Sequence, residues 1–347
     1  MESMVIHMNK DFWTSKKVLV TGSNAFIGSW LTETLVREGA NVTAFVKENE
    51  IIGTESIDHL KPGIRIIKGD ILNREDIKKS IEGNEIVFHL AAITQVLYSI
   101  KNPVETVNVN VNGTLNLLEE MRKNKGDQFL IFASTDKVYG EPKYNPIDED
   151  HTLSSKSPYD ASKLAADRLV NSYNISYGVK SSIVRWSNTY GGRDSNILRT
   201  VPDFITSLIN NRPPVIRGDG KNVRDYMHVS DAVNGILTVA EKYKVSNAQS
   251  FNLGTGKPTS LKDLAELIIK LFGKKEKMKP VIRGKKTSGE INIQYLSSKK
   301  AKRILQWQSE IKLKKGLIDT IDWYKKNTEW QKVMKRSEQF YKKQMII

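Results

Sequence analysis

Short apolar runs rich in β-branched and aromatic residues alternate with stretches of helical periodicity along the first two-thirds of the chain. The apolar runs predict strands at residues 17–20, 42–46, 64–68, 86–89, 129–133 and 182–186. The stretches between them predict helices at residues 26–37, 74–81, 104–123 and 159–177. Because strands that alternate with helices pair in parallel through right-handed crossovers, we expect an α/β fold with a Rossmann-type doubly wound parallel sheet.

The rhythm changes after Trp186, where prolines become frequent and the loops lengthen. This change predicts a smaller second region, in which residues 297–302 and 313–326 form terminal helices. The expected divisions are a first domain at residues 14–186 with returning segments near 222–256, a second region at 187–328, and a basic C-terminal tail at 329–347.

The composition limits the chemistry that the chain can carry. The 347 residues include no cysteine, which excludes disulfides and cysteine metal sites and suits a reducing cytosol. Five scattered histidines give no metal-site pattern. No apolar run reaches the ~20 residues of a membrane helix, and the first ten residues lack the apolar segment of a signal peptide. We expect a cytoplasmic protein without a metal or a membrane partner.

The chain is basic, with 54 Lys and Arg against 39 Asp and Glu and a net charge of +15. These residues are spread along the sequence, and no nucleic-acid-binding motif accompanies them. The pattern favours a lysine-rich solvated surface that attracts anionic nucleotides, and we expect no nucleic-acid partner.

A glycine-containing turn follows the first predicted strand, in Val20-Thr21-Gly22-Ser23-Asn24-Ala25-Phe26-Ile27-Gly28. Gly22 permits the tight turn, and Gly28 permits close packing of the helix on the strand. The freed amides and the helix N-terminus would hold a pyrophosphate, with Asn24, Phe26 and Ile27 beside it. Ala25 stands where a middle glycine is usual. The turn predicts that residues 14–186 form a dinucleotide-binding domain.

The second predicted strand ends in Val46-Lys47 and carries no acid to grip the ribose 2′-hydroxyl of NAD. A lysine there suits a 2′-phosphate, so NADP is slightly favoured over NAD, although Lys47 could also be only solvated. Asp70 and Ile71 follow the third strand and are placed to reach the adenine region. Asp70 could equally be the N-cap of the next helix.

Tyr159 and Lys163 are spaced i and i+4 in a predicted helix and therefore share one face. Lys163 can lower the pKa of the phenol and hold a ribose hydroxyl of the cofactor. Tyr159 can then take the proton of a substrate hydroxyl while hydride leaves the same carbon. Behind a phosphate-binding turn, this pair indicates redox chemistry on an alcohol.

Ordered motifs together resemble the extended short-chain dehydrogenase/reductases, in particular the NAD(P)-dependent nucleotide-sugar epimerase/dehydratase family, and the similarity covers residues 14–328. Besides the turn and the Tyr-Lys pair, they are His89-Leu90-Ala91-Ala92, Asn110-Val111-Asn112-Gly113-Thr114, Ser134-Thr135-Asp136-Lys137-Val138-Tyr139-Gly140, Ser187-Asn188-Thr189-Tyr190-Gly191, Arg224-Asp225-Tyr226 and Asn252-Leu253-Gly254-Thr255-Gly256.

The resemblance implies several binding roles. It implies cofactor contacts at Leu90, Ala91, Ala92 and Asn110, and a nucleotide-diphosphate sugar as substrate. Asn188 and Arg224 would bind the diphosphate, with Arg217 and Arg193 as looser candidates, so that 187–328 is mainly a nucleotide-sugar-binding region. It also implies a homodimer through helices 104–123 and 159–177. His89 and His228 stand in apolar surroundings and are expected to be structural.

By the same resemblance, Thr135 bonds the sugar O4. Epimerases commonly follow it with small residues, whereas Asp136 and Lys137 follow it here. Oxidation at C4 acidifies the C5 proton, and elimination then needs an acid and a base beside that carbon. Asp136 is the implied acid. Lys137 is the implied C5 base, with Glu141 as a second candidate; a surface Asp-Lys pair in a loop is the alternative.

We therefore expect a 4,6-dehydratase (a lyase) that oxidises C4 of an NDP-hexose with bound NAD(P)+, removes water across C5–C6 and returns the hydride. The Asp-Lys pair, as well as residues 213–226, resembles CDP-glucose 4,6-dehydratases, and UDP-N-acetylglucosamine dehydratases share the pair. Return of the hydride to C6 would give a 4-keto-6-deoxy sugar, and return to C4 a 5,6-ene. The alternatives are an NDP-sugar 4-epimerase and a non-catalytic family member.

Overall fold

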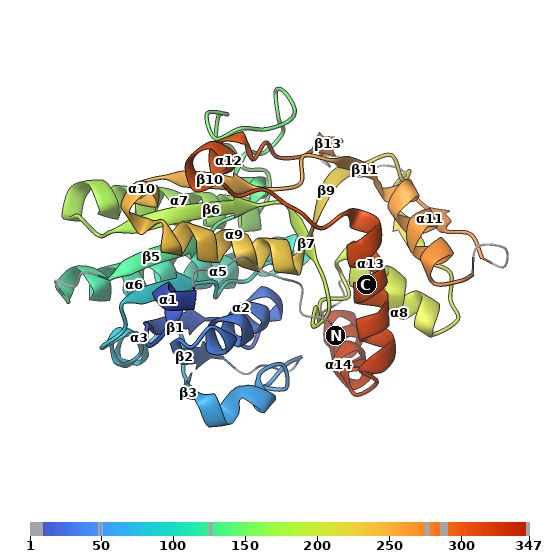
Figure 1. Ribbon diagram of the computed structural model, residues 1–347. Helices are drawn as coiled ribbons and strands as arrows, with labels where there is room; N and C mark the ends of the chain where they lie inside the picture. The colour runs from blue at the N-terminus through green and yellow to red at the C-terminus, as the bar shows by residue number, and fades with distance from the viewer. Residues whose placement is uncertain are drawn as a thin grey trace.

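The computed structural model describes residues 10–47, 49, 51–124, 128–274, 278–284 and 291–344, and its centre is a parallel sheet of seven strands (Figure 1). The strand order is β3-β2-β1-β4-β5-β6-β10, and all neighbours pair in parallel. The strands are β1 (Lys17–Thr21), β2 (Asn41–Val46), β3 (Ile64–Lys68), β4 (Ile86–His89), β5 (Phe129–Ala133), β6 (Ser181–Trp186) and β10 (Ser250–Leu253). This order confirms the doubly wound fold.

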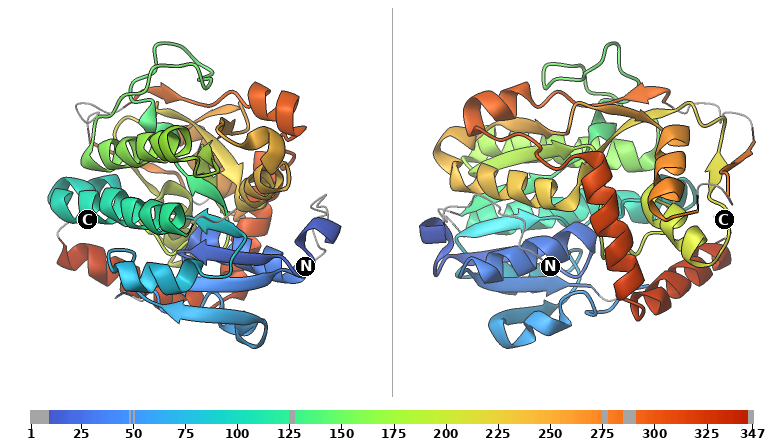
Figure 2. Two further views of the ribbon diagram at one scale, coloured as in Figure 1. Left: turned by 90° about the vertical axis from the view of Figure 1, so that its left-hand side faces the viewer. Right: turned by 45° about the vertical axis from the view of Figure 1, so that its right-hand side comes forward.

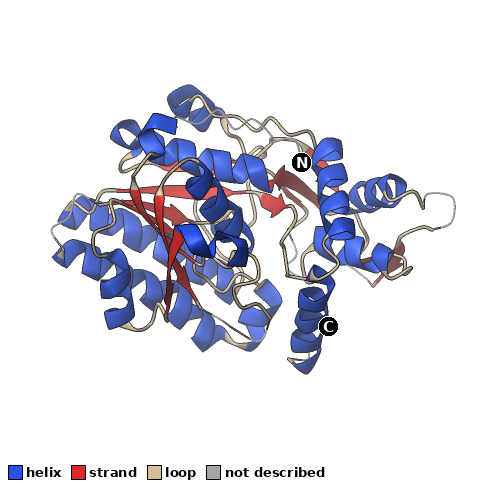
Figure 3. Ribbon diagram, turned by 60° about the horizontal axis from the view of Figure 1, so that its bottom comes forward, coloured by secondary structure: helices blue, strands red, loops and turns tan. Residues whose placement is uncertain are grey.

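Helices cover both faces of the sheet (Figures 2 and 3). One face packs against α2 (Phe26–Arg37) and α9 (Val229–Glu241). The other face packs against α3 (Arg74–Ile81), α6 (Gly113–Lys123) and α7 (Pro158–Tyr177). Both faces of the sheet are therefore covered, and β5 accordingly consists only of apolar, buried residues.

The helix predicted at residues 104–123 is confirmed as a continuous helical segment, but its middle turn is a π-helix that the sequence pattern did not predict. The structure has α4 (Val96–Lys101) and α5 (Pro103–Val107), then a π-helical turn η2 (Asn108–Asn112), then α6. Inside the turn, Asn110 accepts a hydrogen bond from the amide of Ile93 at 2.8 Å and donates to the carbonyl of Ile93 and the hydroxyl of Ser162. The π turn accompanies these long-range bonds, as such turns often do at functional sites.

The second region has two small sheets and its own apolar core. The sheets hold β7 (Asn188–Tyr190), β9 (Val223–His228), β11 (Pro258–Ser260) and β13 (Ile293–Gln294), and β8 (Val215–Arg217) with β12 (Val281–Arg283). Its helices are α8 (Thr200–Ile209), α11 (Leu261–Leu271), α13 (Leu313–Lys326) and α14 (Trp330–Lys343). The remaining short elements are α1 (Lys10–Trp13), η1 (Asp58–Gly63), η3 (Asp136–Val138), α10 (Tyr243–Ser246) and α12 (Lys299–Leu305).

Helix α14 differs from the expectation of a basic tail. Its buried residues Trp330, Val333 and Met334 belong to the core of the second region, while its lysines face outward. Arg336 donates to the carbonyl of Ile51 at 2.9 Å, which ties the helix to the loop after β2. Because the segment is rich in lysine, its amphipathic helical pattern was not recognised in the sequence.

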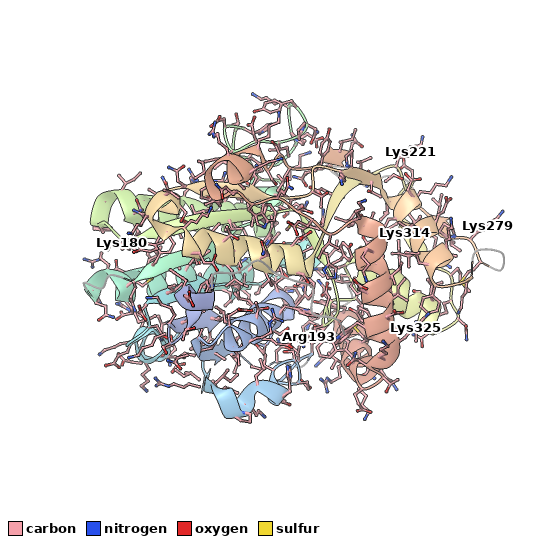
Figure 4. The ribbon with its side chains drawn as sticks, in the orientation of Figure 1. Lys180, Arg193, Lys221, Lys279, Lys314 and Lys325 are labelled. Carbon is pink, nitrogen blue, oxygen red and sulfur yellow. The ribbon has the colours of Figure 1, made fainter. Side chains whose placement is uncertain are left out.

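The surface carries its positive charge in many places. Lys180 lies at one end of the molecule, Lys221 and Lys279 lie towards the other end, and Lys314 and Lys325 lie on α13 (Figure 4). In the part of the chain that the structure describes, no helix is long and apolar enough to cross a bilayer.

Candidate active site

The turn between β1 and α2 forms an anion-binding cradle. Gly22 has a φ of +70°, which favours glycine, and a Cβ at Gly28 would lie 2.1 Å from the carbonyl oxygen of Gly22. The first turn of α2 carries no acidic residue and no side-chain cap, so its amides face the turn without a competing group. These features fit the pyrophosphate of a dinucleotide.

The other residues of the turn brace it against the rest of the fold. The amide of Asn24 donates to the carbonyls of Lys47 and Gly53, at 3.3 and 2.7 Å, and so joins the turn to the loop after β2. Phe26 is buried in the core on that face of the sheet, and Ile27 packs against it. Asn24 thus acts first as a structural brace.

Lys47 and Asp70 meet at the ends of β2 and β3, with Nζ and Oδ2 2.5 Å apart. Burial raises the pKa of Asp70, but its bonds with the amide of Leu72 and with Lys47 outweigh burial and lower that pKa overall. Asn73, and not Asp70, caps α3. The second strand therefore ends in a lysine whose charge is offset by an acid from the third.

The loop after β4 is held close to this turn. The amides of Leu90 and Ala91 donate to the hydroxyl of Thr21 at 3.1 and 3.2 Å. Ala92 follows, and the side chain of Asn110 bonds both backbone groups of the next residue, Ile93. Ile71 packs on α6, where a Cβ at Gly113 would lie 2.5 Å from its Cδ1. These predicted cofactor residues thus lie in the loops, and in the helical turns beside them, at the carboxyl edge of the sheet.

Tyr159 and Lys163 lie in the first turns of α7 and are buried. Burial raises the pKa of Tyr159 to about 12, against a hydrogen bond with Thr135 and the charge of Arg199, both of which lower it. Lys163 donates to the carbonyl of Ala133 at 2.6 Å, and burial lowers its pKa to about 7. In the protein alone, burial thus outweighs the groups that lower the pKa of the phenol.

Thr135 caps the short helix η3 and accepts from the amide of Lys137 at 3.3 Å. Asp136 is buried, and Nζ of Lys137 lies 3.2 Å from its Oδ2. Nζ also donates to Oε1 of Gln294 at 2.5 Å. Burial lowers the pKa of Lys137, with Asp136 opposing and Arg224 reinforcing that shift. The pair is therefore not a solvated surface pair.

Glu141, the second candidate base, is directed elsewhere. Its carboxylate is exposed and pairs with Lys156 at 2.7 Å. Of the two candidates, Lys137 is the one that lies with Asp136, Thr135 and Tyr159.

The expected diphosphate residues occupy different settings. Nδ2 of Asn188 is buried and has no hydrogen-bond partner among the described residues. The guanidinium of Arg224 donates to the carbonyls of Val223 and Ile291, each at 2.8 Å, and does not pair with Asp225. Asn188 and Arg224 stand on the neighbouring strands β7 and β9, so the structure brings them together.

Two other arginines lie apart from them. Arg217 is exposed on β8, in the small sheet with β12. Arg193 is ion-paired with Glu33, and its guanidinium lies 4.5 Å from the centre of the Trp30 ring. Arg193 therefore braces α2. The buried histidine His89 pairs with Thr21 and Thr114, which agrees with a structural role.

The structure adds two residues that the sequence did not indicate. Arg199 is paired with Asp194 and donates to Thr94 at 3.3 Å. Gln294 contacts Lys137 and the backbone of Asp136. Gln294 is far in sequence from the motifs, and Arg199 follows the Ser187–Gly191 motif by eight residues, but an isolated Arg or Gln carries no local signal of such contacts.

Comparison with known proteins agrees with this geometry. The sequence model of a family described as GDP-mannose 4,6 dehydratase matches residues 19–320. A putative UDP-glucose 4-epimerase of Methanocaldococcus jannaschii is 35% identical over 313 residues, which cover 89% of this chain and 99% of that protein.

Two solved structures show the same fold. The epimerase Mth375 of Methanothermobacter thermautotrophicus superposes with a TM-score of 0.88 at 27% identity, covering 96% of this chain and 99% of that one. The dTDP-glucose 4,6-dehydratase DesIV of Streptomyces venezuelae, solved with NAD, gives a TM-score of 0.84 at 26% identity, covering 90% and 98%. Dehydratases and epimerases thus both resemble this chain, which belongs to the GDP-mannose 4,6-dehydratase family of extended short-chain dehydrogenase/reductases, enzymes that modify sugar nucleotides with a nicotinamide cofactor.

Proposed function

We propose that the protein is an NDP-hexose 4,6-dehydratase. The observation that carries the proposal is the contact of the buried Asp136 with the partly buried Lys137, beside Thr135 and Tyr159. A 4-epimerase needs a base for the C4 hydroxyl but no acid and base for elimination. Burial of a charged pair is unfavourable in free energy. A role in the elimination would explain why the protein keeps this pair.

The first step is oxidation at C4. When bound, a nicotinamide would supply the hydride acceptor for C4. Thr135 would bond the C4 oxygen, and Tyr159, as phenolate, takes the hydroxyl proton while the C4 carbonyl forms. Because burial raises the pKa of Tyr159, the phenolate needs positive charge nearby. Arg199 supplies part of that charge, and protonated Lys163 and an oxidised cofactor would add to it.

The second step is loss of water. Elimination requires Lys137 as the free amine and Asp136 as the carboxylic acid. With the proton on the carboxyl group, the amine of Lys137 removes the C5 proton and Asp136 protonates the departing C6 hydroxyl. With hydride delivered to C6, Lys137 would return its proton to C5, which gives a 4-keto-6-deoxy sugar. The proton that Tyr159 took from O4 would then restore the acid Asp136. The net change is one water lost.

The substrate is proposed to be UDP-N-acetylglucosamine or CDP-glucose. Asn188, with its unpaired buried amide, and Arg224 would bind the diphosphate. Arg217 would contact the nucleotide. At the adenosine end, Lys47 could meet the 2′-phosphate of NADP, whereas Asp70 could accept from the 2′-hydroxyl of NAD, so both dinucleotides are candidates.

Mass spectrometry of the product tests the reaction. Purified protein with bound cofactor is incubated with each of the two substrates and with UDP-glucose. Loss of one water from the sugar nucleotide is expected, and NMR then separates the 4-keto-6-deoxy product from the isobaric 5,6-ene. An isomer of unchanged mass would instead support the 4-epimerase, which the 35% identity to a putative epimerase keeps as the second candidate.

The assembly is proposed to be a cytoplasmic homodimer. Helices α5 and α7 expose apolar side chains, among them Val104 at 73% and Ile175 at 74%. Exposed apolar side chains on neighbouring helices are typical of an interface.

A further inference from the structure

Gln294 is a buried polar side chain beside the proposed acid and base. It lies on β13, pairs across from Arg224 of β9, and has no exposed surface. A buried amide is costly unless its donor and acceptor are both bonded. Both ends of the amide of Gln294 are bonded, and each to the Asp136-Lys137 segment.

The two bonds fix the orientation of the amide. Oε1 accepts from Nζ of Lys137 at 2.5 Å, and Nε2 donates to the backbone carbonyl of Asp136 at 3.1 Å. Turning the amide over would set its two donor hydrogens against the lysine amine and its oxygen against a carbonyl oxygen. The oxygen of Gln294 therefore faces Lys137.

Lys137 has charged neighbours from several elements. Asp136 of η3 and Asp160 of α7 favour its ammonium form, and Arg224 of β9 disfavours it. Gln294 of β13 adds a close acceptor without a negative charge. A carboxylate at the same place would hold the ammonium form by its charge.

The bonds also leave one direction at the nitrogen open. Nζ is bonded to its own carbon, to Gln294 and to Asp136, which takes up three of its four tetrahedral positions. The fourth is available for a lone pair that accepts a proton. Without Gln294, the flexible side chain of Lys137 would lose this fixed direction.

We propose that Gln294 is a positioning residue for dehydration: its neutral amide fixes the direction of the Lys137 amine and still allows the amine to lose its proton. The inference rests on the proposed function, since C5 deprotonation is the step that it serves. Gln294 acts through Lys137 and not on the sugar.

The first test measures the Lys137 amine without any substrate. Native protein, Gln294→Glu and Gln294→Met are treated with limiting acetic anhydride over a range of pH, and acetylation of Lys137 is quantified by mass spectrometry against the exposed Lys314 of the same sample. In Gln294→Glu, the midpoint should move to higher pH by about one unit or more, which means at least a tenfold smaller neutral fraction. Gln294→Met, matched in length and uncharged, should show no upward shift.

The second test uses the reaction. In Gln294→Glu, the rising limb of the kcat/KM profile for water loss should move to higher pH, so that activity recovers under alkaline conditions. In Gln294→Met, water loss should fall about tenfold at every pH, because the amine loses its fixed direction. C4 oxidation should persist in both, so reduced nicotinamide should accumulate after substrate is added.

The outcomes separate the two proposals. Thermal unfolding first establishes that the variants are folded. If the labelling profile of Lys137 is the same in native protein and folded Gln294→Glu, the positioning role is wrong; Gln294→Met with native water loss would also overturn it. If the labelling profile shifts as expected but native protein removes water from no NDP-hexose, the effect of Gln294 on the Lys137 amine is confirmed and the proposed function is wrong.

Discussion

The side chain of Lys137 is partly buried, and its surroundings decide whether its amine can act as a base. Burial and Arg224 lower its pKa, whereas Asp136 raises it. A lysine in water is almost fully protonated at neutral pH. Burial therefore brings this side chain closer to the uncharged form that proton abstraction requires.

Replacement of the two candidate bases distinguishes them. Lys137→Gln should slow water loss on the order of 10²–10⁴-fold and leave C4 oxidation in place. Glu141→Gln is the matched control and should be as active as native protein, because Glu141 is exposed and paired with Lys156. Steady-state water loss and the absorbance of reduced nicotinamide measure the two steps. Loss of activity in Glu141→Gln alone would reverse the assignment.

His89 makes stability depend on pH. Burial lowers its pKa from 6.5 to about 3 in the folded state, so between these values the unfolded chain binds a proton that the folded protein does not. Stability from the neutral form is therefore present above pH 6.5 and is lost as pH falls towards 3, by about 1.4 kcal/mol per pH unit.

His89→Gln removes this dependence. The variant should be less stable than native protein at pH 8, because the bonds to Thr21 and Thr114 are altered. The difference should shrink by about 1.4 kcal/mol per pH unit below pH 6, since all other titrating groups are common to both proteins. Urea unfolding at several pH values measures it, and a constant difference would contradict the argument.

At the scale of elements, the candidate site is assembled from the ends of strands. The carboxyl ends of β1, β2, β4 and β5 meet at one edge of the parallel sheet, where ligands bind in this architecture. The loops that follow are joined by Asn24, Thr21 and Asn110. Helix α14 adds a further contact, through Arg336 and the loop after β2.

The ends of β2 and β3 should set the preference between dinucleotides. Asp70→Asn removes the acid that offsets Lys47 and would repel a 2′-phosphate. The affinity for NADP should therefore rise several-fold relative to that for NAD, and Lys47→Ala should change the ratio in the opposite direction. Fluorescence titration of both dinucleotides measures the ratio, and an unchanged ratio in Asp70→Asn would place this pair outside the adenosine site.

Helix α14 should contribute to folding. Trp330 is buried and its ring centre lies 5.4 Å from that of Trp323. Trp330→Ala should destabilise the protein by about 3 kcal/mol through loss of buried apolar contacts. Lys335→Ala, on the exposed side of the same helix, should change stability little. Equal thermal stability of the two variants would mean that α14 is not part of the core.

At the scale of the whole molecule, two parts of the chain meet at the candidate site. The first part supplies the Tyr-Lys pair from α7 and the Thr-Asp-Lys segment that follows β5, and the second region supplies Asn188, Arg224 and Gln294. Segments from late in the chain return to the first core, where α9 packs beside α2. Substrate binding and chemistry therefore depend on one continuous fold.

The exposed apolar side chains of α5 and α7 should form the dimer interface. Val104→Arg combined with Ile175→Arg should give a monomer, because each places a charge where apolar surface would be buried. Sedimentation at micromolar protein should show a dimer for native protein and a monomer for the double variant. A native monomer would exclude this assembly.

The sequence by itself determined the strand and helix pattern, the glycine turn and the Tyr-Lys and Thr-Asp-Lys motifs. Local periodicity and backbone freedom are properties of neighbouring residues, so helix 26–37 and strand 129–133 agree with the structure at both ends. The spacing of Tyr159 and Lys163 is likewise a local helical relation.

Only the tertiary structure decided which groups surround them. The π turn at Asn110, the pairing of Lys47 with Asp70, and the contact of Gln294 with Lys137 join residues that are distant in sequence. The burial of α14 could not be predicted for the same reason, because its apolar face packs against Ile51 and the core of the second region. Burial and charge depend on neighbours that folding brings together, and these fix the pKa of Lys137 and hence its chemistry.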